Sequence, residues 1–473
     1  MPPPTGAAAL PDPRLRVHVA PGVRVREAGR LVIGGEPLRL MRLAAAGATV
    51  LAAWRRGAPV GDAPGAAALA RRLLDAGALL SDPVTRAVGD VAVVVPTRDR
   101  APQLARCLRA LRHSGAGSVV VVDDGSADAG AVRAAAAAHG AAVVRRERAG
   151  GAAAARNAGT AATDAPFVAF VDSDVVVGEG WLQRLRGHFD DPAVGAAAPR
   201  VLALEEDDAG SPIAAYELRR SSLDMGAVPA SVAPGRRLAY VPSAAVVVRR
   251  SALSGGGFDA ALKVGEDVDL VWRMVAAGWR VAYDPEARVR HEHRVRPVPF
   301  LVRRWDYARS IGPLARRHPD ALPALRFDGW TAAVVALVVG GRPAPAAALA
   351  LVRGRRLQGE LAARSDQPGL LAAELSARAY GGAAHGLGHA VRRVWSPPLA
   401  AVALAGPPWP RVRARALLAG AFALAALEDR PPTPTAAALS LVDDLIAAFG
   451  TWAGAITART ATPLLPRVSR RPA

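Results

Sequence analysis

The chain has 473 residues, a hydrophobic fraction of 51% and a formal net charge of +19. This length is typical of about two or three domains. The single cysteine, Cys107, excludes an intramolecular disulfide and a zinc site built on thiolates, and it fits a reducing cytosolic setting. The charge does not predict nucleic-acid binding, because nearly all of it is arginine in an Ala/Gly/Pro-rich background and no nucleic-acid-binding motif accompanies it.

Residues 1–88 are predicted to form a small module of their own. The segment RVHVAPGVRVREAGRLVIGGEPLRLMRL alternates apolar and polar residues between Pro-Gly and Gly-Gly breaks, as short antiparallel strands do. AALARRLLDAGALL then places apolar residues at helical spacing. No signal peptide is expected, because the N-terminus lacks a basic region followed by an apolar stretch. The module contains no catalytic cluster, so we expect it to bind a partner.

Residues 89–300 alternate between buried strands and helices. Four apolar runs predict the strands: VAVVVP (91–96), SVVVVDDGS (118–126), AAVVRRE (141–147) and PFVAFVDSD (166–174). Three segments with helical spacing lie between them: 101–114, 129–140 and 152–163. Right-handed crossovers between such strands predict an α/β fold with a doubly wound sheet, whose ligands bind outside the carboxyl ends of the strands.

Five aspartates fall at these carboxyl ends, namely Asp99, Asp123, Asp124, Asp172 and Asp174. Side chains alternate along a strand, so Asp172 and Asp174 are expected on one face, where their like charges repel. A divalent cation would relieve this repulsion, and hard oxygen ligands suit Mg²⁺ or Mn²⁺. The dipeptide Asp123-Asp124 could contact a nucleotide, but it is equally compatible with an ordinary strand-to-helix turn.

Two later segments add further candidates. In GEDVDLVWRM, Leu270 and Met274 predict the buried side of a helix, and Glu266, Asp267 and Asp269 lie in its first turn. Acidic residues there complement the helix dipole, but three of them exceed what capping needs. In RVRHEH, His291 and His293 are expected on one face of a strand, a spacing that favours metal ligation.

Taken in order, VPTRDR, VDDGS, ARNAG, DSD and GEDVDL followed by GW resemble the motifs of inverting family-2 glycosyltransferases, which have the GT-A fold. The resemblance covers roughly residues 90–300. It implies a UDP-sugar donor and a nucleotide-sugar site at Pro96, Thr97, Asp99, Asp124, Arg156 and Asp172. It implies Mn²⁺ or Mg²⁺ at Asp172, Asp174 and His291, and Asp267 as the base. Asp99 departs from the pattern, since many relatives carry Asn there. The departure concerns the contact of this residue with the nucleobase of the donor.

Within this family the sequence resembles the glycosyltransferases of mycofactocin systems. The segment GGEPLRLMRL is similar to winged-helix-like peptide-recognition modules, and RRWDYARSIGPLARRHP (303–319) follows the catalytic core as in those relatives. The resemblance implies transfer of glucose from UDP-glucose onto a ribosomal-peptide-derived redox cofactor precursor, building a β-1,4 oligosaccharide. One alternative is a lipid-linked or cell-wall acceptor; another, of a different class, is a non-catalytic peptide escort.

Residues 301–473 are Ala/Arg-rich and predicted to be helical, with Pro and Gly interruptions. Trp330–Val352 is apolar but contains Arg342, which costs roughly 2.5–3.5 kcal/mol near the middle of a span. We expect buried or surface-associated helices here, with a membrane span as the alternative. Arginines near Trp305 and Trp330 predict peripheral attachment to an anionic membrane, at the inner face of the cell membrane.

Overall fold

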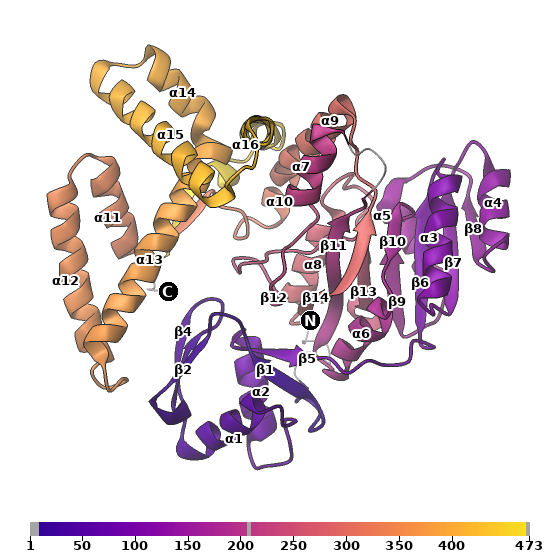
Figure 1. Cartoon of the computed structure of the whole chain (residues 1–473), viewed down its shortest axis with the longest axis horizontal. Coiled ribbons are helices and arrows are strands. Elements are labelled where there is room, and N and C mark those ends of the chain that lie inside the picture. Colours follow the sequence, from indigo (N-terminus) through magenta and orange to yellow (C-terminus); the bar gives the residue numbers. More distant parts are fainter. Residues whose placement is uncertain (1–8, 206–209, 470–473) are drawn as a thin grey trace. The chain divides into compact units, whose positions relative to one another are not determined.

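The computed structural model describes residues 9–205 and 210–469. Contacts divide the chain into two compact units, Met1–Arg294 and Val295–Ala473 (Figure 1). The predicted N-terminal module and the catalytic sheet both belong to the first unit.

The N-terminal module has a small hydrophobic core of its own. A three-stranded antiparallel sheet and a two-stranded pair surround two helices: β1 (Arg16–Val19), β2 (Arg24–Arg26), a 3₁₀ turn η1 (Glu27–Gly29), β3 (Leu31–Gly34), β4 (Arg39–Arg42), α1 (Ala45–Arg55), α2 (Ala66–Asp75) and β5 (Leu79–Asp82). The predicted helix is α2, which buries Leu73 and Leu74 beside Trp54. Helix α1 was not predicted, because its Ala-rich start has no capping side chain.

The first half of the catalytic sheet forms as the apolar runs predicted. Its strands and crossover helices are β6 (Val91–Thr97), α3 (Ala101–His113), β7 (Ser118–Asp124), α4 (Ala129–Ala137), β8 (Ala142–Arg146), α5 (Gly151–Ala161) and β9 (Phe167–Val171). The strands lie in the order β8-β7-β6-β9, and all neighbours are parallel. Their carboxyl ends therefore share one edge.

The second half turns this into a mixed nine-stranded sheet. It contains β10 (Val175–Val177), α6 (Trp181–Gly187), η2 (His188–Asp190), β11 (Val194–Ala203), α7 (Pro212–Arg220), β12 (Ala230–Val232), β13 (Ala245–Arg249), η3 (Arg250–Leu253), α8 (Glu266–Ala276) and β14 (Arg280–His291). Strand β13 is antiparallel to both β9 and β11, and β14 is parallel to β11. The end of β14 therefore lies at the same edge as the ends of β6, β7 and β9.

Alternate residues of β6 face opposite layers of helices. Val93 and Val95 pack in one core with Leu104 of α3, whereas Val94 faces α5. A Cβ on Gly159 of α5 would come within 2.3 Å of Val94, so the glycine permits this close approach. Helices on both faces of a mixed sheet confirm the predicted doubly wound α/β fold.

The second unit is mostly helical, as predicted. It comprises α9 (Pro297–Arg309), α10 (Ile311–Arg317), β15 (Leu325–Asp328), α11 (Gly329–Val339), α12 (Pro343–Leu361), α13 (Pro368–Ala390), a π-helical turn η4 (Val391–Trp395), α14 (Ser396–Ala405), α15 (Pro408–Asp429), α16 (Pro434–Thr457), η5 (Thr462–Leu464) and β16 (Pro466–Ser469). The stretch Trp330–Val352 is not one helix, because α11 ends at Val339 and α12 begins at Pro343.

Among the described residues, α16 alone is long and apolar enough to cross a membrane by length and composition, a test that the core helix of a soluble protein also passes. It carries two buried aspartates, Asp443 and Asp444, which pair with Arg392 and Arg393 of η4. Within this unit α16 also packs along α9 and α10.

Candidate active site

Two aspartates and a histidine meet at the carboxyl edge of the sheet. Strand β9 ends at Val171, and the backbone N–H of Val175 donates to the Asp172 carbonyl, which closes a turn over residues 172–174. Strand β10 then pairs with the end of β14, so that Val175 lies opposite His291. Ligand atoms of Asp172, Asp174 and His291 all lie within 4.8 Å of one another. The three predicted metal ligands therefore come together.

The prediction that these residues lie on strands was wrong for Asp172, Asp174 and His293. Asp172 and Asp174 lie in a turn and not on one face of a strand. Likewise β14 ends at His291, so His293 lies beyond the strand, although its ring centroid is still 5.1 Å from that of His291. A tight turn and an antiparallel partner strand produce the cluster.

The donor set of this cluster fits a divalent cation. It offers carboxylate oxygens of Asp172 and Asp174 together with one imidazole, and carboxylates are ligands that Mn²⁺ and Mg²⁺ accept. The His291 Nε2 atom is 3.3 Å from Asp174 Oδ1. Its Nδ1 atom is buried and has no hydrogen-bond partner. The ring nitrogen that faces Asp174 is therefore Nε2, and the imidazole has no hydrogen bond on its other nitrogen.

Two arginines partly neutralise the aspartates. Arg156 is buried and donates from Nη2 to Asp172 Oδ1 at 2.7 Å, while Arg100, which immediately precedes α3, pairs with Asp174 Oδ2. Burial opposes ionisation of Asp174, but the charges of His291 and Arg100 outweigh it, and its pKa is lowered. Arg100 was not among the predicted site residues, although it closes the VPTRDR motif that was singled out.

A second pair of acids lies on the other side of Arg156. Glu266 and Asp267 begin α8, directly after Gly265, whose φ of +86° places it in the left-handed region. Arg156 donates from Nη1 to Glu266 at 2.9 Å. Asp267 accepts instead from two backbone N–H groups, those of Ser243 at 3.1 Å and Val268 at 2.8 Å. Glu266 is thus tied to the arginine, whereas Asp267 is held by backbone alone.

Burial raises the pKa of Asp267, and the hydrogen bond from Ser243 and the charge of Arg156 offset this only in part. The pKa of Glu266 is raised as well, by burial and then by the charge of Asp267. A carboxylate with a raised pKa is a better proton acceptor, which suits a general base. The third acid of this turn, Asp269, is buried and binds Arg273 at 2.7 Å, one turn along the helix, so it stabilises α8.

The residues predicted to bind the nucleotide line the ends of β6 and β7. Pro96 and Thr97 are buried at the end of β6, and the Thr97 hydroxyl has no hydrogen-bond partner. Asp99 has a φ of +55°, and its carboxylate accepts from the Ala127 N–H at 2.7 Å. This contact joins the loops that follow β6 and β7.

Asp124, in contrast, is already fully engaged. It pairs with Arg146 of β8 and accepts from the N–H groups of Gly150 and Gly151 at the start of α5. Asp124 thus contacts the start of α5, whereas the helix that follows its own strand, α4, is capped by Asp128. A contact of Asp124 with the nucleotide stays a prediction.

Comparison with known proteins shows the family of this chain. Residues 92–229 match the profile of glycosyl transferase family 2, and residues 167–342 match that of glycosyl transferase family group 2. Pre-mycofactocin glycosyltransferase from Mycobacterium tuberculosis (strain H37Rv) is 40% identical over 358 residues, which is 74% of each chain. The chain belongs to the family-2 pre-mycofactocin glycosyltransferases.

Other similarities are more distant. The O-antigen chain rhamnosyltransferase RfbN of Salmonella typhimurium is 24% identical over 46% of this chain and 70% of its own length. A solved mannosyltransferase from Pyrobaculum calidifontis, in complex with GDP-Man and Mn²⁺, has a TM-score of 0.43 and 21% identity, covering 78% of this chain and 89% of that one.

In this family-2 glycosyltransferase, the residues of the ARNAG motif have two different roles. Arg156 alone faces the carboxylates. Asn157 exchanges two hydrogen bonds with the backbone of Phe258, at 2.7 and 2.9 Å, and so fixes the loop that leads to α8. Gly159 permits the close packing of α5 on β6.

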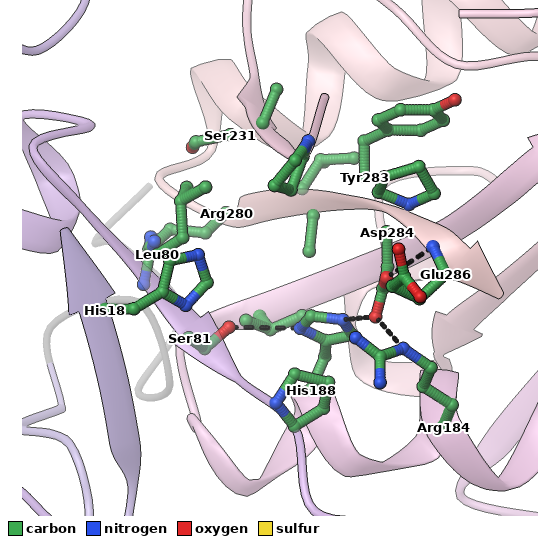
Figure 2. Close-up of a pocket in the computed structure, with 17 residues that line it drawn as sticks. His18, Leu80, Ser81, Arg184, His188, Ser231, Arg280, Tyr283, Asp284 and Glu286 are labelled. Carbon is green, nitrogen blue, oxygen red and sulfur yellow. Dashed lines mark hydrogen bonds and ion pairs between the residues drawn. The ribbon is translucent and has the colours of Figure 1, made fainter. Parts of the chain in front are cut away.

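The glycosyltransferase also has a cavity of about 210 Å³ between the N-terminal module and the sheet (Figure 2). Ser81 Oγ is 3.0 Å from His188 Nδ1, and His188 Nε2 is 3.0 Å from Asp284, which also accepts from Arg184 at 2.7 Å. Because a carboxylate can only accept, Nε2 of His188 donates to Asp284. These hydrogen bonds connect β5 through His188 to the amino-terminal half of β14. The metal-ligand cluster lies at the opposite end of β14.

Proposed function

We propose that this glycosyltransferase transfers glucose from UDP-glucose onto premycofactocin with inversion at the anomeric carbon, building a β-1,4 oligosaccharide. The observation that carries the mechanism is the separation of two sets of carboxylates by Arg156. Asp172 and Asp174 converge with His291, whereas Asp267 lies on the other side of the arginine with its own backbone hydrogen bonds.

In this mechanism the acceptor hydroxyl oxygen forms a bond to the anomeric carbon while the bond from that carbon to the diphosphate oxygen breaks. UDP departs with the electron pair, and the hydroxyl proton passes to Asp267. Mn²⁺ or Mg²⁺ held by Asp172, Asp174 and His291 would supply charge neutralisation for the diphosphate. Arg156 keeps Glu266 and Asp172 in place, and the unpartnered Thr97 hydroxyl is available to the nucleoside.

The position of the N-terminal module supports a role in binding the peptide-derived acceptor. Glu36 accepts from the backbone N–H of Arg237 at 3.1 Å, and the Asp75 carbonyl accepts from Arg236 at 2.8 Å. The same segment leads to Ser243, whose N–H holds Asp267. The segment from Arg236 to Ser243 therefore connects the module to Asp267, the proposed base, and an acceptor bound to the module would lie beside this segment. We further propose a cytoplasmic location at the inner face of the cell membrane, on the basis of the single cysteine and the arginines near Trp305 and Trp330.

The test compares Asp267→Asn with Glu266→Gln, using UDP-glucose and premycofactocin. We expect Asp267→Asn to bind UDP and Mn²⁺ normally while turnover falls by roughly 10²–10⁴-fold, the usual contribution of a general base. Glu266→Gln should lose less. Near-normal turnover by Asp267→Asn, or a product that retains the α configuration of the donor, would refute the mechanism.

A further inference from the structure

Two helical hairpins of the second unit combine exposed apolar side chains with arginines, and the acids of their helices, Glu360, Glu428 and Asp429, lie at the ends remote from the turns. Trp330–Gly359, which covers α11 and most of α12, contains four arginines and no Asp or Glu. Ser396–Leu427, which covers α14 and most of α15, contains three arginines and no Asp or Glu. The helices of each hairpin pack against each other (Figure 1). A helical surface that is apolar and purely cationic is typical of binding to an anionic bilayer.

The apolar side chains gather near the turn between α14 and α15. Leu404 is 77% exposed and Trp409 is 75% exposed, on either side of Gly406-Pro407-Pro408, and Val412 is exposed one turn along α15. Exposed large side chains at a turn contribute nothing to the core of the unit. Tryptophan in particular is favoured at the boundary between lipid and water.

The turn of the other hairpin lies beside this one. The guanidinium of Arg413 on α15 lies 3.3 Å from the place that a Cβ on Gly341 would occupy, so α15 reaches the turn between α11 and α12. Arg342 follows in that turn, and both arginines are exposed. Val338, at the end of α11, is exposed too. The two turns therefore form one surface, the hairpin surface, composed of Val338, Arg342, Leu404, Trp409, Val412 and Arg413.

Not every arginine of the α14–α15 hairpin serves this surface. Arg411 donates twice to the Gly406 carbonyl, at 3.0 and 2.8 Å, and Arg415 donates to the Ala403 carbonyl at 3.0 Å. They bind the last carbonyls of α14 and so hold the turn in shape. Arg304, which the sequence placed in a membrane-facing group, is buried and pairs with Asp443.

We propose that the hairpin surface docks on an anionic phospholipid bilayer, with Leu404 and Trp409 entering the interface and Arg342 and Arg413 contacting lipid phosphates. The proposal deepens the membrane location given under the proposed function and is independent of the sugar chemistry. A bilayer is favoured over an acidic protein because large exposed apolar side chains and exposed arginines occur together at both turns.

The test is co-sedimentation of the full chain with vesicles of phosphatidylcholine, with and without phosphatidylglycerol. The wild type should bind only vesicles that contain phosphatidylglycerol and should be released by high salt. The double variant Leu404→Ser/Trp409→Ser should bind at least about tenfold more weakly. Arg342→Gln/Arg413→Gln should lose about fivefold per arginine.

Leu427→Ser is the matched control. Leu427 is 72% exposed on the same helix, but it lies at the far end of α15 beside Glu428 and Asp429. Its replacement should leave vesicle binding unchanged.

Wild-type levels of binding by Leu404→Ser/Trp409→Ser would overturn the proposal. So would a change from dimer to monomer in that variant without vesicle binding, because the surface would then join two copies of the chain. Transfer from UDP-glucose to soluble premycofactocin should be equal in all variants, so failure of the transferase assignment is distinguishable from failure of the docking surface.

Discussion

Replacing Asp191 with asparagine should loosen the N-terminal module from the catalytic sheet. Asp191 has no exposed surface, and it binds Arg71 of α2 and Arg280 of β14, the latter at 2.6 Å. The side chains of both arginines are largely buried, with 10% and 12% exposed. The substitution would leave two buried cations without their shared anion. Breaking a buried ion pair in this way costs about 3–5 kcal/mol.

The assay is thermal unfolding together with limited proteolysis of the segment 83–90 between module and sheet. We expect the melting temperature of the Asp191→Asn variant to fall by roughly 5–15 °C, and cleavage in this segment to become faster. Asp75→Asn is the control, since Asp75 lies 3.4 Å from Arg71 and 3.9 Å from Arg280 but is 53% exposed. A surface pair of this kind contributes about 0–1 kcal/mol.

The pH dependence gives an internal check. Burial opposes ionisation of Asp191, but Arg280 and Arg71 outweigh it, and its pKa is lowered. A depressed pKa contributes stability above the unfolded value, about 3.9, and this stability is lost as the pH falls through the folded value. The melting temperatures of the wild type and Asp191→Asn should therefore begin to converge as the pH falls below about 3.9, and they should meet once the pH is below the folded value. Equal melting temperatures at pH 7, or a difference that persists in acid, would refute the reasoning.

Three further outcomes are expected at the active site. Asp174→Asn should abolish the Mn²⁺ dependence of UDP binding, measured by thermal shift, and unaltered Mn²⁺ dependence would count against the metal assignment. Thr97→Val should weaken UDP binding by about five- to tenfold without lowering the melting temperature, because the hydroxyl has no partner in the protein to lose; normal affinity would exclude it from the nucleoside site. The acid limb of the pH–rate profile should lie above the ordinary Asp value of about 3.9, because the raised pKa of Asp267 means that the base becomes protonated earlier as the pH falls; a limb at or below that value would exclude Asp267 as the base.

The sequence by itself determined the first half of the catalytic sheet and the order of its motifs. Runs such as VAVVVP (91–96) and PFVAFV (166–171) are apolar at every position, and only a strand covered on both faces suits such a run, so composition and length predicted β6 and β9. The same argument placed Asp172 and Asp174 at a carboxyl edge. Helix α1 was not predicted, because its alanine-rich sequence shows only weak hydrophobic periodicity and its start has no capping side chain.

Only the tertiary structure decided which charged groups meet. His291 joins Asp174 because β10 pairs antiparallel with β14, a contact between segments that lie far apart in the chain. Arg156 is 110 residues from Glu266 and still bridges that acid to Asp172. Local patterns carry no information on such long-range pairing, which depends on sheet order and register. The same holds for Asp124, whose carboxylate is satisfied by Arg146 and α5 because β7 and β8 are parallel neighbours.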